Sequence, residues 1–153
     1  ALEKLEFSVP EAGKNWPAPP AALRPLIIMT SNSEKNLPDA FLRRVVYYHI
    51  PFPDDAMLLR IVSKKVDGFE TADLKKIIAH FEAVRDDKQV KLRKKPATAE
   101  LINWTALLHK IGFPASKLED TDQLSDTERR WLLMSYSVLA KSKEDLKALE
   151  EWL

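Results

Sequence analysis

The sequence predicts a short α/β segment over residues 1–53, followed by an α-helical bundle over residues 54–153. Leu26–Thr30 and Val45–Ile50 are short runs of apolar and aromatic residues bounded by prolines or polar residues. Such runs are typical of strands covered on both faces in a parallel sheet. From Asp54 onward the apolar residues recur at the three- and four-residue spacing of amphipathic helices. The change of spacing after Pro53 is the predicted domain boundary.

The composition is that of a soluble globular protein, with 45% hydrophobic and 31% charged residues and a formal net charge of +1. A charge so close to zero provides no field of one sign, which argues against nucleic acid as a partner. The chain has no cysteine, and its histidines, His49, His80 and His109, lack metal-binding spacing, so no metal site is predicted. The longest apolar run, Leu26–Met29, is too short to cross a membrane. We therefore expect a cytoplasmic protein without a membrane partner.

The first 53 residues contain further short elements. Glu6–Pro10 alternates polar and apolar residues, which predicts a short exposed strand, and Gly13 permits a turn after it. Three of the four residues at 17–20 are prolines, which favours a stiff surface loop over a proline-motif ligand. Pro38–Arg43 predicts one helical turn, with proline at its first position.

Capping residues and apolar spacing predict four or five helices after Pro53. The predicted starts are Asp54 or Asp55, Thr71, near Thr98, Ser125 and Ser142. Ser125 with Glu128 and Ser142 with Asp145 form capping-box patterns, and the first helix is predicted to end near Gly68. The side chains predicted to face the core are Met57, Leu58, Ile61, Val62, Leu74, Ile77, Ile78, Phe81, Val84, Leu101, Trp104, Leu108, Ile111, Trp131, Leu132, Met134, Tyr136, Leu139, Leu146, Leu149 and Trp152.

Polar residues follow the first predicted strand and precede the second. Asn32 comes after the strand end, where ligands of open α/β sheets bind, and its amide suits a water held toward a phosphate. The alternative for Asn32 is an ordinary turn residue. Arg43 and Arg44 suit either a solvated helix end, where cations complement the helix dipole, or an arginine finger for a transferring phosphoryl group.

The order of these motifs resembles the second half of the core of MoxR-type AAA+ ATPases. The resemblance rests on T-S-N after the first run, then L-P-D-A-F-L-R-R, then I-P-F-P after the second run. It implies that Asn32 is the sensor-1 residue, that Arg44 is the arginine finger with Arg43 beside it, and that a helical lid begins at Asp54. The two runs would then be strands of a parallel AAA+ sheet.

The sequence departs from this family in what it lacks. It contains no G-x-x-x-x-G-K-[ST] phosphate loop and no apolar run ending in Asp-Glu, both of which precede sensor 1 in the family. The chain therefore resembles a carboxyl-terminal fragment, which we expect to be inactive alone. The sensor-2 position falls at Ala99 or Glu100, so Lys94, Lys95 or Arg93 would have to substitute for it. Lys94, Lys95 and Thr98 are the candidates for the nucleotide-facing side of the lid. The alternative for these residues is a solvated basic connector.

For the full-length protein, the resemblance implies ATP hydrolysis with ATP and Mg²⁺ as cofactors, neither expected to bind this fragment tightly. It also implies a homo-oligomeric ring of neighbouring subunits and a client protein that is remodelled or matured. The alternative function is a helical protein-interaction module without nucleotide chemistry.

Overall fold

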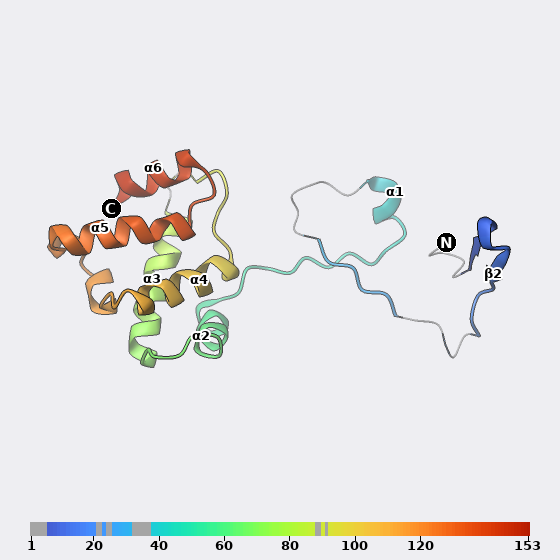
Figure 1. Ribbon diagram of the computed structural model, residues 1–153, viewed down its shortest axis with the longest axis horizontal. Coiled ribbons are helices and arrows are strands. Elements are labelled where there is room, and N and C mark those ends of the chain that lie inside the picture. Colours follow the sequence, from blue (N-terminus) through green and yellow to red (C-terminus); the bar gives the residue numbers. More distant parts are fainter. Residues whose placement is uncertain (1–5, 21–22, 24–25, 32–37, 88–89, 91) are drawn as a thin grey trace. The chain divides into compact units, whose positions relative to one another are not determined.

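The computed structural model describes residues 6–20, 23, 26–31, 38–87, 90 and 92–153. These residues are mostly helical, with one two-stranded antiparallel sheet, and the chain divides into two compact units, Ala1–Tyr48 and His49–Leu153 (Figure 1). The elements of the first unit are β1 (Phe7–Val9), η1 (Pro10–Ala12), β2 (Lys14–Trp16) and α1 (Asp39–Leu42). Those of the second are α2 (Asp55–Ser63), α3 (Thr71–Asp86), α4 (Thr98–Lys110), η3 (Ala115–Leu118), η4 (Thr121–Gln123), α5 (Asp126–Ser135), η5 (Tyr136–Val138) and α6 (Lys143–Trp152).

In the first unit, β1 and β2 form a small hairpin. Its register pairs Val9 with Lys14. Gly13 closes the turn with a φ of 60°, a left-handed conformation that favours glycine, and its amide donates to the Pro10 carbonyl at 3.1 Å. The predicted strand at Glu6–Pro10 and the turn at Gly13 are confirmed. The second strand was not predicted, because only three residues separate the turn from the prolines.

The two predicted buried strands differ from what the structure contains. Described residues 26–31 and 45–50 form no strand, and their side chains are largely exposed: Leu26 is 88% exposed and Val46 is 99% exposed. The expectation that these runs are covered on both faces is therefore wrong for this chain by itself. A strand buried on both faces needs neighbouring strands and a layer on each side, which the described part of the first unit does not supply.

Three helices of the second unit, α2, α5 and α6, begin where a side chain accepts a hydrogen bond from a free amide, whereas α3 begins at Thr71 without a side-chain cap. Asp54 accepts a hydrogen bond from the Met57 amide at 2.8 Å. At the start of α5, Ser125 and Glu128 form the predicted reciprocal capping box. At α6, Ser142 caps the Asp145 amide as predicted.

The Asp145 carboxylate does not complete a second box. It is buried and accepts a hydrogen bond from the Arg93 amide at 2.7 Å, which ties the segment before α4 to α6. Only half of the predicted capping box is therefore formed, because the Asp145 carboxylate bonds to the Arg93 amide instead of the Ser142 amide.

Gly68 separates α2 from α3 with a φ of 93°. A Cβ atom at this position would lie 2.1 Å from Nε2 of His109, so both the backbone conformation and the close ring favour glycine. Helix α2 was predicted to end near Gly68 but ends at Ser63.

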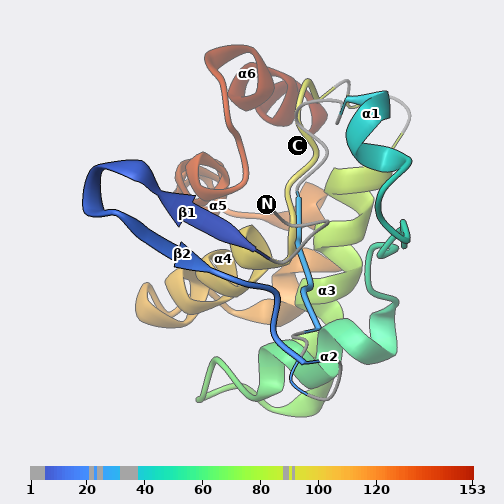
Figure 2. The ribbon, with the colours of Figure 1, turned by 90° about the vertical axis from the view of Figure 1, so that its right-hand side faces the viewer.

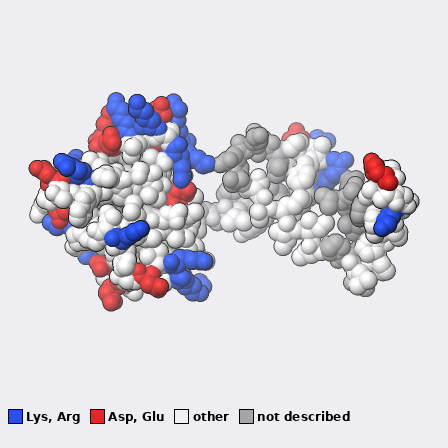
Figure 3. Space-filling view, viewed as in Figure 1, with Lys and Arg blue, Asp and Glu red and all other residues white. Residues whose placement is uncertain are grey.

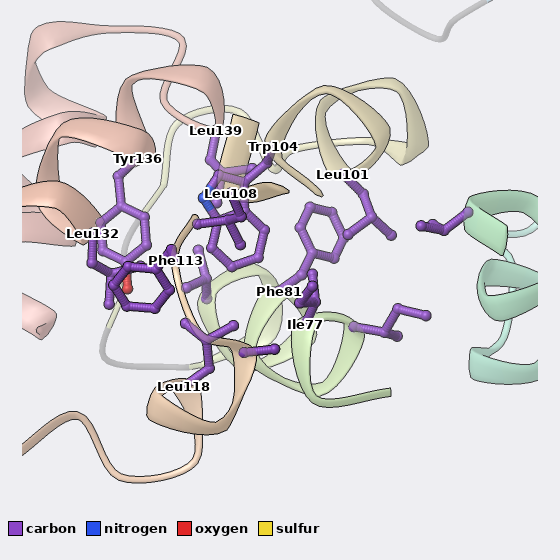
Figure 4. Close-up of a cluster of buried hydrophobic side chains, with 14 of the residues drawn as sticks. Ile77, Phe81, Leu101, Trp104, Leu108, Phe113, Leu118, Leu132, Tyr136 and Leu139 are labelled. Carbon is purple, nitrogen blue, oxygen red and sulfur yellow. The ribbon is translucent and has the colours of Figure 1, made fainter. Parts of the chain in front are cut away.

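The core of the second unit lies among α3, α4 and α5. Helix α3 packs against α2, α4 and η3, and α4 packs against α5 and η5 (Figures 1 and 2). Large side chains such as Phe81, Trp104 and Tyr136 are fully buried between these elements (Figure 4). Most predicted core residues are buried or half-buried, but Met57, Trp131 and Met134 are exposed.

A buried polar contact runs through this core. His80 Nδ1 lies 3.2 Å from the Leu118 carbonyl and therefore donates, so the neutral ring accepts at Nε2 from the Tyr136 hydroxyl at 2.7 Å. The ring of His80 also stacks on Trp104 at 5.7 Å. Burial lowers the pKa of His80 to about 4, even though the Leu118 hydrogen bond opposes this shift.

We predict that acid destabilises the fold through His80. Between pH 6.5 and pH 4, the His80 ring is protonated in the unfolded chain but neutral in the folded chain. The free energy of unfolding therefore falls as pH falls, by about 3 kcal/mol in total. Urea unfolding across this range measures the slope. His80→Gln should flatten it whatever the stability of that variant at pH 7, whereas His49→Gln, at an exposed position, should not. An unchanged slope in His80→Gln would contradict the prediction.

Within the described residues, no helix has both the length and the apolar character needed to cross a bilayer.

Candidate functional site

The arginine pair lies at the carboxyl end of α1. Pro38 precedes this helix, and Arg43 follows its last residue in a helical conformation. Both arginine side chains are exposed, and Arg44 Nη1 donates to the Ala40 carbonyl at 2.6 Å. This hydrogen bond caps a free helix carbonyl and leaves the guanidinium at the surface. The position suits a cation presented to another molecule as well as it suits a solvated helix end.

Asn32, the predicted sensor-1 residue, lies outside the described residues, as do the residues that follow it up to 37. Arg43 and Arg44 belong to the first unit, whereas Lys94, Lys95 and Thr98 belong to the second. Each group is therefore described by itself.

Thr98 is the first residue of α4 and is half-buried. Glu100 in the same turn accepts a hydrogen bond from the Ala97 amide at 2.8 Å and forms an ion pair with Lys141 at 2.7 Å. Partial burial opposes ionisation of Glu100, but the hydrogen bonds from Lys141 and Ala97 outweigh it and lower the pKa of this carboxyl. The start of α4 thus already holds a carboxylate, which disfavours a phosphate at the same amides.

The two predicted lysines lie on the segment before α4 and are exposed. Lys95 Nζ lies 2.5 Å from Oδ1 of Asp86, the last residue of α3. This ion pair lies between the segment and the end of α3, and an exposed pair of this kind adds little to the free energy of unfolding. In Figure 3, basic and acidic side chains are interspersed over α6 and the neighbouring 92–97 segment. The surface there is mixed in charge.

A contact that was not predicted joins the I-P-F-P segment to the helical unit. The guanidinium carbon of Arg85 lies 3.7 Å from the centroid of the Phe52 ring, and Arg85 Nη1 also donates to the Pro96 carbonyl. Phe52 also stacks against Phe81 at 6.5 Å between ring centroids. One arginine therefore connects the entry to α2 with the entry to α4.

Sequence reasoning missed Arg85, Phe52 and Lys141 as site-forming residues. A cation–π pair between residues 33 positions apart and an ion pair between residues 41 positions apart leave no local pattern in the chain. Only tertiary packing, of α2 against α3 and of α4 against η5, brings these side chains together.

Among the described residues, no group of three or more His, Asp or Glu side chains is placed to hold a metal ion. Comparisons with protein-family models, with curated proteins and with solved structures found no match to this chain.

Proposed function

We propose that this chain is the carboxyl-terminal part of a MoxR-like AAA+ ATPase. In the whole protein it would couple ATP binding and hydrolysis to the remodelling or maturation of client proteins. The observation that carries the proposal is one of order: T-S-N, L-P-D-A-F-L-R-R and I-P-F-P follow one another, and a compact helical unit begins directly afterwards with the Asp54 cap.

The proposal assigns different tasks to Asn32 and to the arginine pair. Asn32 orients the attacking water at the end of the first run. Arg44 stabilises negative charge on the γ-phosphoryl group bound by a neighbouring subunit, with Arg43 beside it. The exposure of both guanidiniums supports this assignment, because a finger has to reach beyond its own subunit.

The exposed apolar runs support a sheet completed by other strands. Leu26 and Val46 lie on runs whose apolar side chains are mostly exposed in this chain. In the proposed protein these runs are two strands of a parallel sheet whose remaining strands precede them. Burying one such side chain is worth about 1.5–3 kcal/mol, so the runs provide a driving force for that assembly.

The helical unit is the proposed lid. Because Phe52 contacts both Arg85 and Phe81, the segment that enters α2 is anchored to α3. A movement of the proposed core would then be transmitted to α3 and, through Pro96, to the start of α4. Lids commonly couple nucleotide state to movement in this way.

The residues of this chain fit only part of an ATP site. The sequence has no phosphate loop or magnesium-holding acid, and Glu100 already occupies the start of α4. Lys94, Lys95 and Thr98 are the lid residues we assign to the nucleotide-facing side. ATP and Mg²⁺ therefore belong to the proposed longer protein.

The coding sequence before Ala1 tests the proposal. We expect it to encode a phosphate loop and an apolar strand ending in Asp-Glu, and we expect the longer protein to hydrolyse ATP in a coupled-enzyme assay. The 153-residue chain alone should show no turnover. An upstream sequence without these motifs, or robust hydrolysis by the 153-residue chain, would overturn the proposal.

A further inference from the structure

The helical unit carries an apolar groove of about 570 Å³ between α4 and α5. Most of the atoms over α4 and α5 in Figure 3 belong to uncharged residues. We call this feature the α4–α5 groove. Its lining residues are Leu107, Ile111, Trp131, Met134, Ser135 and Ser137.

Two large apolar side chains stand exposed in this groove. Trp131 is 43% exposed and Met134 is 67% exposed, although their neighbours on α5, Leu132 and Ser135, are buried. Helix α5 thus presents one face to the core and a second apolar face to the groove. Tryptophan supplies a large share of the binding energy at protein interfaces, and methionine adapts its shape to different partners.

The hydroxyl donors of the groove are already used within the chain. The Ser135 hydroxyl accepts from the Trp104 indole at 2.8 Å and donates to the Leu132 carbonyl at 2.7 Å. The Ser137 hydroxyl donates to the Met134 carbonyl at 2.8 Å. A polar small molecule needs convergent donors and acceptors to be oriented, and these two serines have no donor to spare. Recognition here therefore rests mainly on apolar contact.

The charges next to the lining residues are basic. Lys110 lies three positions after Leu107, so it shares the side of α4 on which Leu107 lies. Arg130 lies four positions before Met134 and shares its side of α5. One acid, Glu128, lies three positions before Trp131 on the same side of α5, but its carboxylate already accepts hydrogen bonds from Ser125 and is paired with Lys117 at 3.7 Å.

We propose that the α4–α5 groove binds an amphipathic helix of a partner protein whose apolar anchors are flanked by Asp or Glu. A helix with anchors at i, i+3, i+4 and i+7 is the usual occupant of an apolar groove, and its acidic flanks would meet Lys110 and Arg130. A second copy of this chain is a poorer occupant, because a symmetric contact would place these cations against their own equivalents. The proposal does not depend on ATP chemistry.

The test uses the full 153-residue chain and two fluorescent helical peptides. Both carry leucines at i, i+3, i+4 and i+7, and their flanking positions are all Glu in one peptide and all Lys in the other. We expect the Glu peptide to bind with a Kd of about 10 μM by fluorescence anisotropy, the range of many transient contacts, and the Lys peptide to bind at least about tenfold more weakly.

Truncation variants locate the contact. Trp131→Ala and Met134→Ala should each weaken binding of the Glu peptide by about fivefold or more. Met57→Ala is the matched control, because Met57 is also exposed, at 43%, but lies on α2 outside the groove. Far-UV circular dichroism and the urea midpoint establish that each variant is folded.

Charge reversal tests the partner class. Lys110→Glu combined with Arg130→Glu should invert the preference, so that the Lys peptide binds more tightly. Lys64→Glu combined with Lys65→Glu, at exposed positions after α2, should leave it unchanged. The proposal is overturned if neither peptide binds, if both bind equally, or if Met134→Ala has no effect. Concentration-dependent self-association that Trp131→Ala abolishes would also overturn it, because the occupant would then be a second copy.

Discussion

Arg44→Ala is expected to slow ATP hydrolysis by the proposed longer protein by a factor of about 10³ or more. An arginine finger stabilises the charge that develops on the transferring phosphoryl group, and its removal loses that stabilisation only in the transition state. The kcat should therefore fall much more than KM changes. Steady-state ATP hydrolysis by the assembled protein measures both constants.

Two neighbouring substitutions sharpen this prediction. Arg43→Ala removes a guanidinium of similar exposure one position earlier, and should cost far less activity. Arg44→Lys keeps the charge but loses the planar fork, so it should restore only a small part of the rate. Equal losses from Arg43→Ala and Arg44→Ala would contradict the assignment of the finger to Arg44.

Mixing two inactive variants shows whether Arg44 acts on a neighbour. Asn32→Ala subunits have a defective site but an intact finger, whereas Arg44→Ala subunits have the opposite defect. If the finger crosses a subunit interface, mixed assemblies contain sites with a functional Asn32 and a functional Arg44, and activity returns. No recovery in mixtures that assemble normally would place both residues in the same subunit's site.

Trp104→Ala is expected to destabilise the helical unit by about 3–5 kcal/mol. Trp104 is fully buried, and its indole nitrogen donates to Ser135 at 2.8 Å. The substitution opens a large cavity among α3, α4 and α5 and removes the hydrogen bond (Figure 4). Because small domains are stable by only about 5–15 kcal/mol, much of the unit's stability would be lost. Urea unfolding followed by far-UV circular dichroism measures the change.

Trp131→Ala is the matched control for this loss. The same residue type is removed, but Trp131 is 43% exposed and lies in the α4–α5 groove rather than the core. We expect its stability cost to stay below about 1 kcal/mol. Similar losses from the two substitutions would show that α5 is packed differently from the arrangement described above.

Local sequence signals located the helices well because their causes are local. The Asp54 cap and the Ser125–Glu128 box act within one helical turn, so a short window of sequence contains both partners. The spacing of Leu74, Ile77 and Phe81 similarly identifies the buried face of α3. These predictions are confirmed.

Other predictions failed where the deciding partner is distant. The spacing on α5 placed Met134 inward, yet no other described element of the unit covers that face, and Met134 is 67% exposed. The apolar run at Leu26 predicts burial only if strands and helices surround it. Asp145 was predicted to complete a capping box, but its carboxylate instead accepts a hydrogen bond from the Arg93 amide, 52 positions away.

The amino-acid sequence was enough to predict the helical unit, the caps at Asp54, Ser125 and Ser142, and the motif order from which Asn32 and Arg44 are proposed as ATPase residues. The fold was needed to see that Phe52 is anchored by Arg85, that Glu100 occupies the start of α4, and that α4 and α5 leave an apolar groove open. The physical reason is the range of the interactions. Capping and helical periodicity act over a few residues, whereas ion pairs, ring contacts and exposed faces depend on which helices pack together.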